Sequence, residues 1–149
     1  MPSDVTTMAA QISNGIQGLF AREYGKGPER ARTYFNDECV VVVLHGGLLA
    51  NEERFVEEGD EELVRQVRQR FESLITVEMT ALVEQATGRQ VLTYHSQILF
   101  HPTRTFELFV LDAPQALLGF RGGALLARLR RNASDAQRQA KEDETESEE

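Results

Sequence analysis

The stretch GKGPERARTYFNDECVVVVLHGGLL, residues 25–49, decides the fold of this chain. Its first residues end a helix, because Gly25 can adopt the left-handed conformation of a C-cap and Pro28 cannot continue a helix. Alternation of small or apolar residues with polar ones over residues 31–35 predicts an outer strand. After a turn, the apolar run at 39–44 is typical of a strand that is covered on both faces. The sequence therefore predicts a β-hairpin with a deeply buried inner strand.

Helical and strand patterns flank this hairpin. Apolar residues recur every three or four positions over residues 5–24 and 60–87, which is the period of a helix with one buried stripe. An acidic stretch at 51–58 predicts one or two surface helical turns, and residues 89–100 and 105–111 show the two-residue period of strands. The order helix-strand-strand-helix-strand-strand predicts an α+β fold. We expect a two-layer sandwich with a mainly antiparallel four-stranded sheet and two amphipathic helices on one face.

The predicted helices can cover only one face of the sheet, although apolar residues occur on both. We therefore expect the opposite face to be covered by a homodimer partner, by another protein, or by the C-terminal segment. The residues that we assign to such an interface are Val41, Val43, Phe109, Leu111, Leu117, Leu118, Leu125 and Leu126.

The composition changes after the last predicted strand. Residues 1–112 carry the patterns of one domain, and residues 113–131 mix leucines with arginines, which predicts a basic-apolar helical extension. This extension could pack on the domain or its dimer mate, bind a partner, or lie at an anionic membrane surface. Residues 132–149 have no apolar side chain larger than alanine, which predicts a disordered acidic tail.

Composition restricts the class of protein. The chain has 149 residues, of which 41% are hydrophobic, as expected for one domain. No apolar run approaches the ~18–20 residues that cross a bilayer, the N-terminal segment lacks the basic region of a signal peptide, and the single Cys39 can form no internal disulfide. These features predict a cytoplasmic protein. The net charge of −8 is concentrated in the tail, so it argues neither for nor against a nucleic-acid partner, and we expect none.

Two places are candidates for ligand binding. Gly25, Lys26 and Gly27 could form an anion-binding loop around a phosphate or bicarbonate, but the loop follows a helix and so lies at the negative end of its dipole. We interpret it as a helix stop and turn. His95, on the more polar face of its predicted strand, could line a shallow site. The three histidines show no metal-ligand spacing, and no catalytic motif occurs, so we assign no catalytic residue, metal or cofactor.

The order of several features is similar to that of a known family. These features are GKGP after the first helix, Leu48-Leu49 leading to Glu53, Arg70-Phe71 in the long helix, TGRQV at 87–91 and FELFVL at 106–111. Over about residues 4–112 the chain resembles the C component of the Na+-translocating membrane-potential-generating system (MpsC-like). Where that family tends to have Leu-Thr-x-x-Glu, this chain has LANEE at 49–53, and we expect Asn51 to replace the capping threonine.

The resemblance implies an accessory role. Systems of this name pair a membrane subunit with a large soluble partner and are linked to inorganic-carbon uptake and membrane potential. We therefore expect a non-catalytic cytoplasmic accessory or interaction domain of such a system, homodimeric, with peripheral contact to the inner face of the cell membrane through residues 117–131 as an open option. The alternative is a small-anion or small-ligand binding protein or enzyme that uses the GKGP loop and His95.

Overall fold

The structure of the protein, a computed structural model, describes residues 4–112 and 138–139. Residues 4–112 belong to one compact unit. The predicted extension at 113–131, and with it Leu117, Leu118, Leu125 and Leu126, lies outside the described residues.

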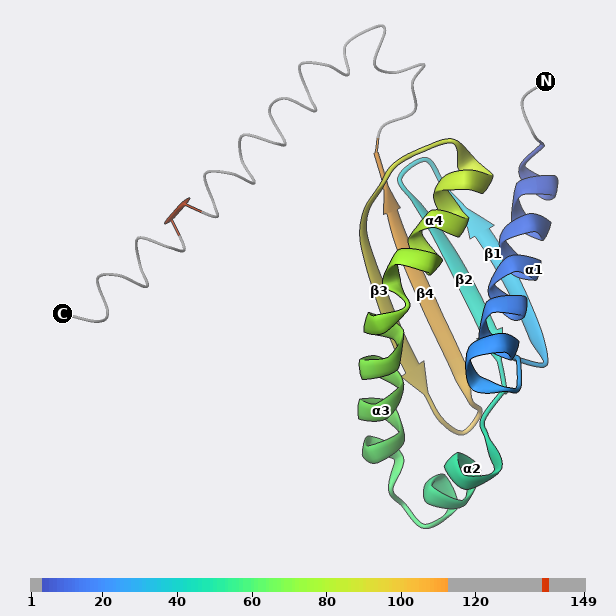
Figure 1. Ribbon diagram of the computed structural model, residues 1–149, viewed down its shortest axis with the longest axis vertical. Helices are drawn as coiled ribbons and strands as arrows, with labels where there is room; N and C mark the ends of the chain where they lie inside the picture. Colours follow the sequence, from blue (N-terminus) through green and yellow to red (C-terminus); the bar gives the residue numbers. More distant parts are fainter. Residues whose placement is uncertain (1–3, 113–137, 140–149) are drawn as a thin grey trace, which may run out of the picture. The chain divides into compact units, whose positions relative to one another are not determined.

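Four helices and four strands make up this unit, in the order α1 (Val5–Tyr24), β1 (Arg30–Phe35), β2 (Cys39–His45), α2 (Ala50–Glu57), α3 (Glu61–Leu74), α4 (Thr76–Thr87), β3 (Val91–Leu99) and β4 (Arg104–Leu111). The sheet has the order β1-β2-β4-β3, and all neighbouring strands are antiparallel. Figure 1 shows α1, α3 and α4 over one face of the sheet, with α2 beyond one of its ends. The predicted α+β fold with an antiparallel sheet is confirmed.

The expected long helix over 60–87 is divided into α3 and α4 at Ile75. Ile75, Thr76 and Val77 are three successive β-branched residues, whose side chains crowd the preceding helical turn. The Thr76 hydroxyl donates a hydrogen bond of 3.1 Å to the carbonyl oxygen of Glu72, which also accepts the Ile75 N–H at 3.2 Å. The break lets α3 pack against α2 and β3, while α4 packs against α1 and β3.

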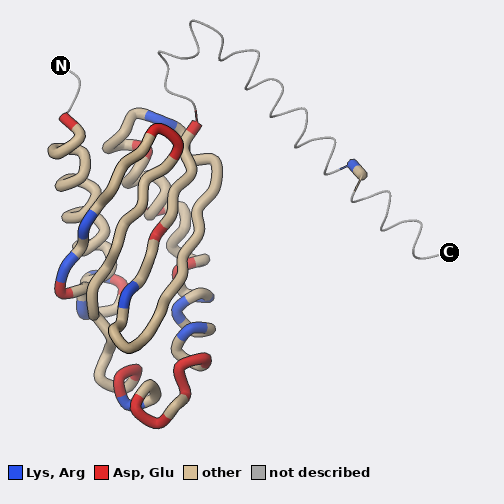
Figure 2. Tube along the Cα trace, turned by 180° about the vertical axis from the view of Figure 1, so that it is seen from behind, with Lys and Arg blue, Asp and Glu red and all other residues tan. Residues whose placement is uncertain are grey.

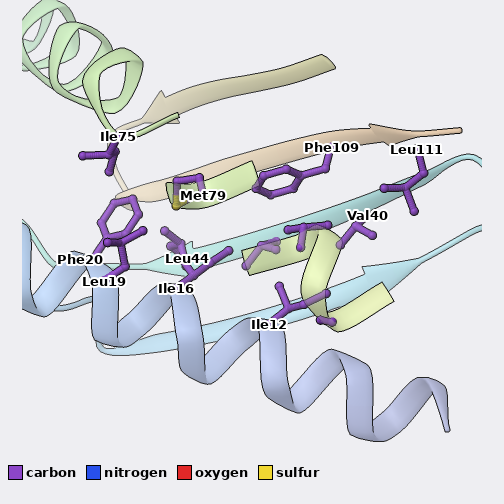
Figure 3. Packing of buried hydrophobic residues seen from close by; sticks show 13 residues of the cluster. Ile12, Ile16, Leu19, Phe20, Val40, Leu44, Ile75, Met79, Phe109 and Leu111 are labelled. Carbon is purple, nitrogen blue, oxygen red and sulfur yellow. The ribbon is translucent and has the colours of Figure 1, made fainter. Parts of the chain in front are cut away.

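The core lies between the helices and the inner strands (Figure 3). Its fully buried side chains are Ile12 and Ile16 of α1, Val40, Val42 and Leu44 of β2, Met79 and Val83 of α4, and Phe109 of β4. Each such side chain contributes about 1.5–3 kcal/mol by leaving water. Burial alternates along β4, so its odd-numbered residues face this core and the even-numbered ones face away.

Two residues of the expected interface therefore belong to the core. Phe109 is 0% and Leu111 is 5% exposed, and both pack in the cluster under the helices. Their assignment to an uncovered interface is wrong, because the period of β4 places them on the covered side. On the other side of β4 the corresponding residues are Phe106, Leu108 and Val110.

Candidate functional site: an open sheet face and a buried carboxylate pair

The second face of the sheet carries none of the described helices (Figure 2). We call it the open face. Its apolar residues are Tyr34, Val41, Val43, Leu99, Phe106, Leu108 and Val110. Tyr34 is 51% exposed and Phe106 is 37% exposed, whereas Val41 and Val43 are half-buried by their neighbours. An antiparallel sheet that faces water usually presents polar residues there, so this apolar strip is typical of a surface with a partner.

Basic residues gather at one end of the open face. The register pairs Arg30 with His45 and His45 with Arg104, which forms a row across β1, β2 and β4. Arg32 lies on the same face of β1. None of these three arginines forms a salt bridge within the described part of the chain. Burial, followed by the charges of Arg104 and Arg30, lowers the pKa of His45, which favours the neutral imidazole.

The strands supply no carboxylate beside this row, and Glu29, directly before β1, is the acidic residue whose charge opposes those of the arginines at His45. Among the residues of the four described strands, the single acidic one is Glu107, which is fully buried on the helix-covered side. The open face is therefore apolar in the middle and positive at one end.

A buried ion pair joins α2 to α3. The Arg68 Nε donates to Glu52 Oε2 at 2.7 Å and Nη2 donates to Glu52 Oε1 at 2.5 Å, with 5% and 10% of the two side chains exposed. Arg68 also donates to the carbonyl oxygen of Gly47 and lies 4.2 Å from the ring centroid of Tyr24. Burial alone would raise the pKa of Glu52, but the hydrogen bonds from Arg68 and from the Leu49 N–H lower it. The pair holds the 46–47 turn, α2 and α3 together.

The same glutamate caps α2. Leu49 is the N-cap residue of α2, and its N–H donates to Glu52 Oε1 at 2.8 Å. Asn51 instead accepts a hydrogen bond from the neighbouring N–H of Glu52. The expectation that Asn51 replaces a capping threonine is therefore wrong, because the side chain at the third helical position satisfies the orphan amide.

Two more carboxylates are buried between α3 and the sheet. Glu107 of β4 is 0% exposed and Glu72 of α3 is 4% exposed. The Tyr94 hydroxyl donates to Glu107 Oε2, and Ser96 Oγ lies 3.1 Å from Glu107 Oε1. We call Glu72 and Glu107 the carboxylate pair.

The environment of the carboxylate pair favours protonation. Burial, and then the charge of Glu72, raise the pKa of Glu107 to about 8. Burial also raises the pKa of Glu72, against the opposing influence of Ser96 and Arg68. Tyr94 remains a neutral donor, because burial and the charge of Glu107 raise the pKa of its hydroxyl.

A pocket of about 190 Å³ adjoins the carboxylate pair. It is lined by Gln69, Glu72, Ser73, Thr76, Tyr94, His95 and Ser96. The expected ligand-binding residue His95 is among these lining residues, but it pairs with Leu108 of β4, so its imidazole lies on the open face of the sheet. Its Nε2 atom is 3.1 Å from the hydroxyl of Thr93.

The structure does not bring the GKGP loop to this pocket. Gly25 is the left-handed C-cap of α1, with φ of 78°. Lys26 donates from Nζ to the carbonyl oxygen of Leu48 at 3.1 Å, and a Cβ at Gly47 would lie 2.9 Å from Pro28 Cα. Gly25, Lys26 and Gly27 are absent from the pocket lining. The loop closes tightly on the turn at 46–48, as its interpretation as a helix stop predicts.

Within the described ranges, no group of three or more histidine, cysteine, aspartate or glutamate residues could hold a metal ion. Over the same residues, no helix has both the length and the apolar character that are needed to span a membrane.

The family model described as Na+-translocating membrane potential-generating system (MpsC) matches residues 5–113. The chain belongs to the MpsC family. The expected resemblance is confirmed, and the match includes the open face, the buried ion pair and the carboxylate pair. Membership associates the chain with a Na+-translocating membrane potential-generating system. Comparisons with curated proteins and with solved structures gave no match.

The buried charged residues of this MpsC domain were not among the expected site residues. Glu52, Arg68, Glu72 and Glu107 lie in stretches that alternate or repeat as solvated faces do. The sequence does contain one indication that Glu107 is buried. It is two residues from Phe109, so the two side chains lie on the same side of β4. A carboxylate at a core position indicates a polar network or a site.

Proposed function

We propose that this MpsC domain is a non-catalytic, cytoplasmic accessory domain that docks through its open face onto another component of the membrane potential-generating system. The observation that supports the proposal is the strip of half-buried valines and exposed aromatic residues on a face without a described helix. A soluble domain rarely leaves such a strip in water unless a partner covers it.

The charges of the open face define the chemistry of the partner. Arg30, Arg32 and Arg104 form no ion pair among the described residues, and arginine is enriched at the centres of protein interfaces. A complementary surface would present an apolar centre and carboxylates at one end. Such complementarity accelerates association and fixes the register of docking more than it raises affinity.

A second copy of the chain is the competing occupant of the open face. In a face-to-face homodimer, the arginines of each copy would meet a face whose strands offer no outward carboxylate. Burying cations without partners costs several kcal/mol. This argument favours an acidic partner over homodimerisation through this face.

A photo-crosslinking amino acid at Val43 tests the docking surface in native membranes. Val43 lies in the middle of the open face, and Val77 of α4, which is 78% exposed on the helical side, is the matched control position. We expect position 43, and not position 77, to give an adduct with a membrane component of the system. Equal adducts at both positions, or an adduct from position 43 with a second copy alone, would contradict the proposal.

A further inference from the structure

We propose that the free edge of β3 binds an extended peptide segment of a partner as an added strand, with one arginine or lysine side chain of that segment seated in the pocket beside Glu72. The sheet order places β3 at an edge, and Figure 1 shows the strand beside α3 and α4. This edge is separate from the open face, so the inference goes beyond the docking proposed above.

The backbone of β3 directs hydrogen-bonding groups along this edge. The Leu111 N–H bonds to the carbonyl oxygen of Glu38, directly before β2, and the direction of bonding alternates along an antiparallel strand. The even-numbered residues of β4 therefore bond to β3, where their partners include His95 and Gln97. The N–H and C=O groups of the residues between them point away from β4, and these residues are Tyr94, Ser96 and Ile98.

One of these groups already has a partner from α3. The Arg65 Nη2 lies 3.5 Å from the carbonyl oxygen of Ile98, which confirms that this carbonyl points away from β4. Within the described part of the chain, no strand pairs with this edge. We therefore place the added strand opposite Tyr94 and Ser96, where backbone pairing of this kind gives affinity to peptide recognition.

Strand β3 lacks the features that usually keep edge strands from pairing. Such strands are commonly short, charged, interrupted by proline or distorted by bulges. With 9 residues β3 is the longest described strand, it has no charged residue or proline, and its register shift is confined to Val91–Thr93. The opposite edge strand, β1, has 6 residues, of which two are arginines. The β3 edge is thus the better suited of the two to accept another strand.

The pocket of about 190 Å³ adjoins the same edge, because its lining joins residues 94–96 of β3 to residues of α3 and α4. Tyr94 and Ser96 pair with Phe109 and Glu107 of β4, so their side chains lie on the helix-covered side. A residue of an added strand opposite either of them would point to that side, towards α3. Pockets for small-molecule ligands usually measure ~300–1,000 Å³. This smaller pocket suits a single side chain.

The charges at the pocket favour a basic side chain. Glu72 lines the pocket and is 4% exposed, and Glu107 behind it already accepts hydrogen bonds from two hydroxyls of β3. Arg68, on the same helix as Glu72, binds both carboxylate oxygens of Glu52. Burial raises the pKa of Glu72, and a guanidinium or ammonium group beside the carboxylate would oppose that effect.

A second copy of β3 is the competing occupant of this edge. Antiparallel pairing of two β3 strands would join two sheets into one. However, β3 has no charged residue, so a second copy of it would bring no cation to Glu72. The charge of the pocket therefore favours a partner segment that carries arginine or lysine.

Selection from an array of random heptapeptides, probed with the full-length protein, tests the pocket. We expect the bound peptides to share an arginine or lysine at one position. In a selected peptide, norleucine at that position should weaken binding about tenfold or more, because hydrogen bonds to a charged group are lost. Glu72→Gln should weaken binding by a similar factor and make it insensitive to the norleucine replacement. Glu78→Gln, at an exposed position of α4, should bind as the wild type does.

N-methylation of the selected peptide tests whether it binds as a strand. Alternate amides of an added strand face β3, so methylation of one alternating set should abolish binding and methylation of the other should leave it unchanged. Hydrogen exchange of the wild-type chain gives a second measurement. The amides of Tyr94 and Ser96 should exchange rapidly in the free chain and slowly with peptide bound, whereas those of His95 and Gln97 should be slow in both.

Three outcomes would overturn the proposal. The first is an array that selects no basic residue, and the second is equal tolerance of both methylated sets. The third is slow exchange at Tyr94 and Ser96 in the free chain, because a second copy or another segment of the same chain would then occupy the edge.

Discussion

Arg68 shows how strongly a single charge in this domain depends on one partner. The residue is 4% exposed, and its guanidinium binds Glu52, the carbonyl oxygen of Gly47 and the face of Tyr24. A cation removed from water to this extent is tolerated because Glu52 satisfies it with two hydrogen bonds. The same pair caps α2, so the loss of either residue affects two elements.

Replacing Arg68 alone should destabilise the domain strongly. Arg68→Met leaves the Glu52 carboxylate buried without its cation, and we expect a loss of about 3–5 kcal/mol in the free energy of urea unfolding. Combining it with Glu52→Gln should recover much of that loss, because the amide oxygen still accepts the Leu49 N–H. Arg54→Met, in an ion pair whose side chains are 74% and 63% exposed, is the control and should cost less than about 1 kcal/mol. Equal losses in Arg68→Met and Arg54→Met would contradict the burial of the pair.

The residues of β4 alternate between the helix-covered side and the open side of the sheet. Phe109 and Glu107 face the helices, while Phe106, Leu108 and Val110 face the open side. Phe109 also stacks on Tyr94, with ring centroids 4.9 Å apart.

The two phenylalanines of β4 should respond very differently to truncation. Phe109→Ala removes a fully buried ring and should cost about 3–5 kcal/mol in unfolding free energy. Phe106 is 37% exposed, and Phe106→Ala should cost less than half as much. Thermal and urea unfolding of the two variants measure this difference. A larger loss for Phe106→Ala would reverse the assignment of the faces.

The sequence predicts the elements better than it predicts which face is covered. Apolar residues on both sides of β4 do not reveal that Phe109 belongs to the core, because that depends on pairing with β2 and β3. The helix break at Ile75 contains no glycine or proline from which it could be predicted. It depends on β-branched residues and a side-chain hydrogen bond.

The buried polar groups were missed for a related reason. Arg68 is 16 residues from Glu52, and Glu107 is 11 residues from Ser96, so each carboxylate depends on a partner from another element. Local patterns carry no information about such pairings. The GKGP loop was predictable, because the conformation of Gly25 and the ring of Pro28 restrict the backbone locally.

At the scale of the whole molecule, the domain has two distinct faces. On one face the helices enclose an apolar core and, beside it, the carboxylate pair with its pocket. The other face remains open, with an apolar strip and a basic row (Figure 2). The open face is the surface through which we propose that this MpsC domain docks.

Reversal of the basic row tests the central claim of docking most directly. The measurement is the amount of a membrane component of the system that co-purifies with the tagged full chain from native membranes. Arg30→Glu with Arg104→Glu should reduce it at least tenfold, and the control pair Arg22→Glu with Arg70→Glu, on exposed positions of α1 and α3, should leave it unchanged. An unchanged yield from the first pair, with both proteins folded, would contradict docking through the open face.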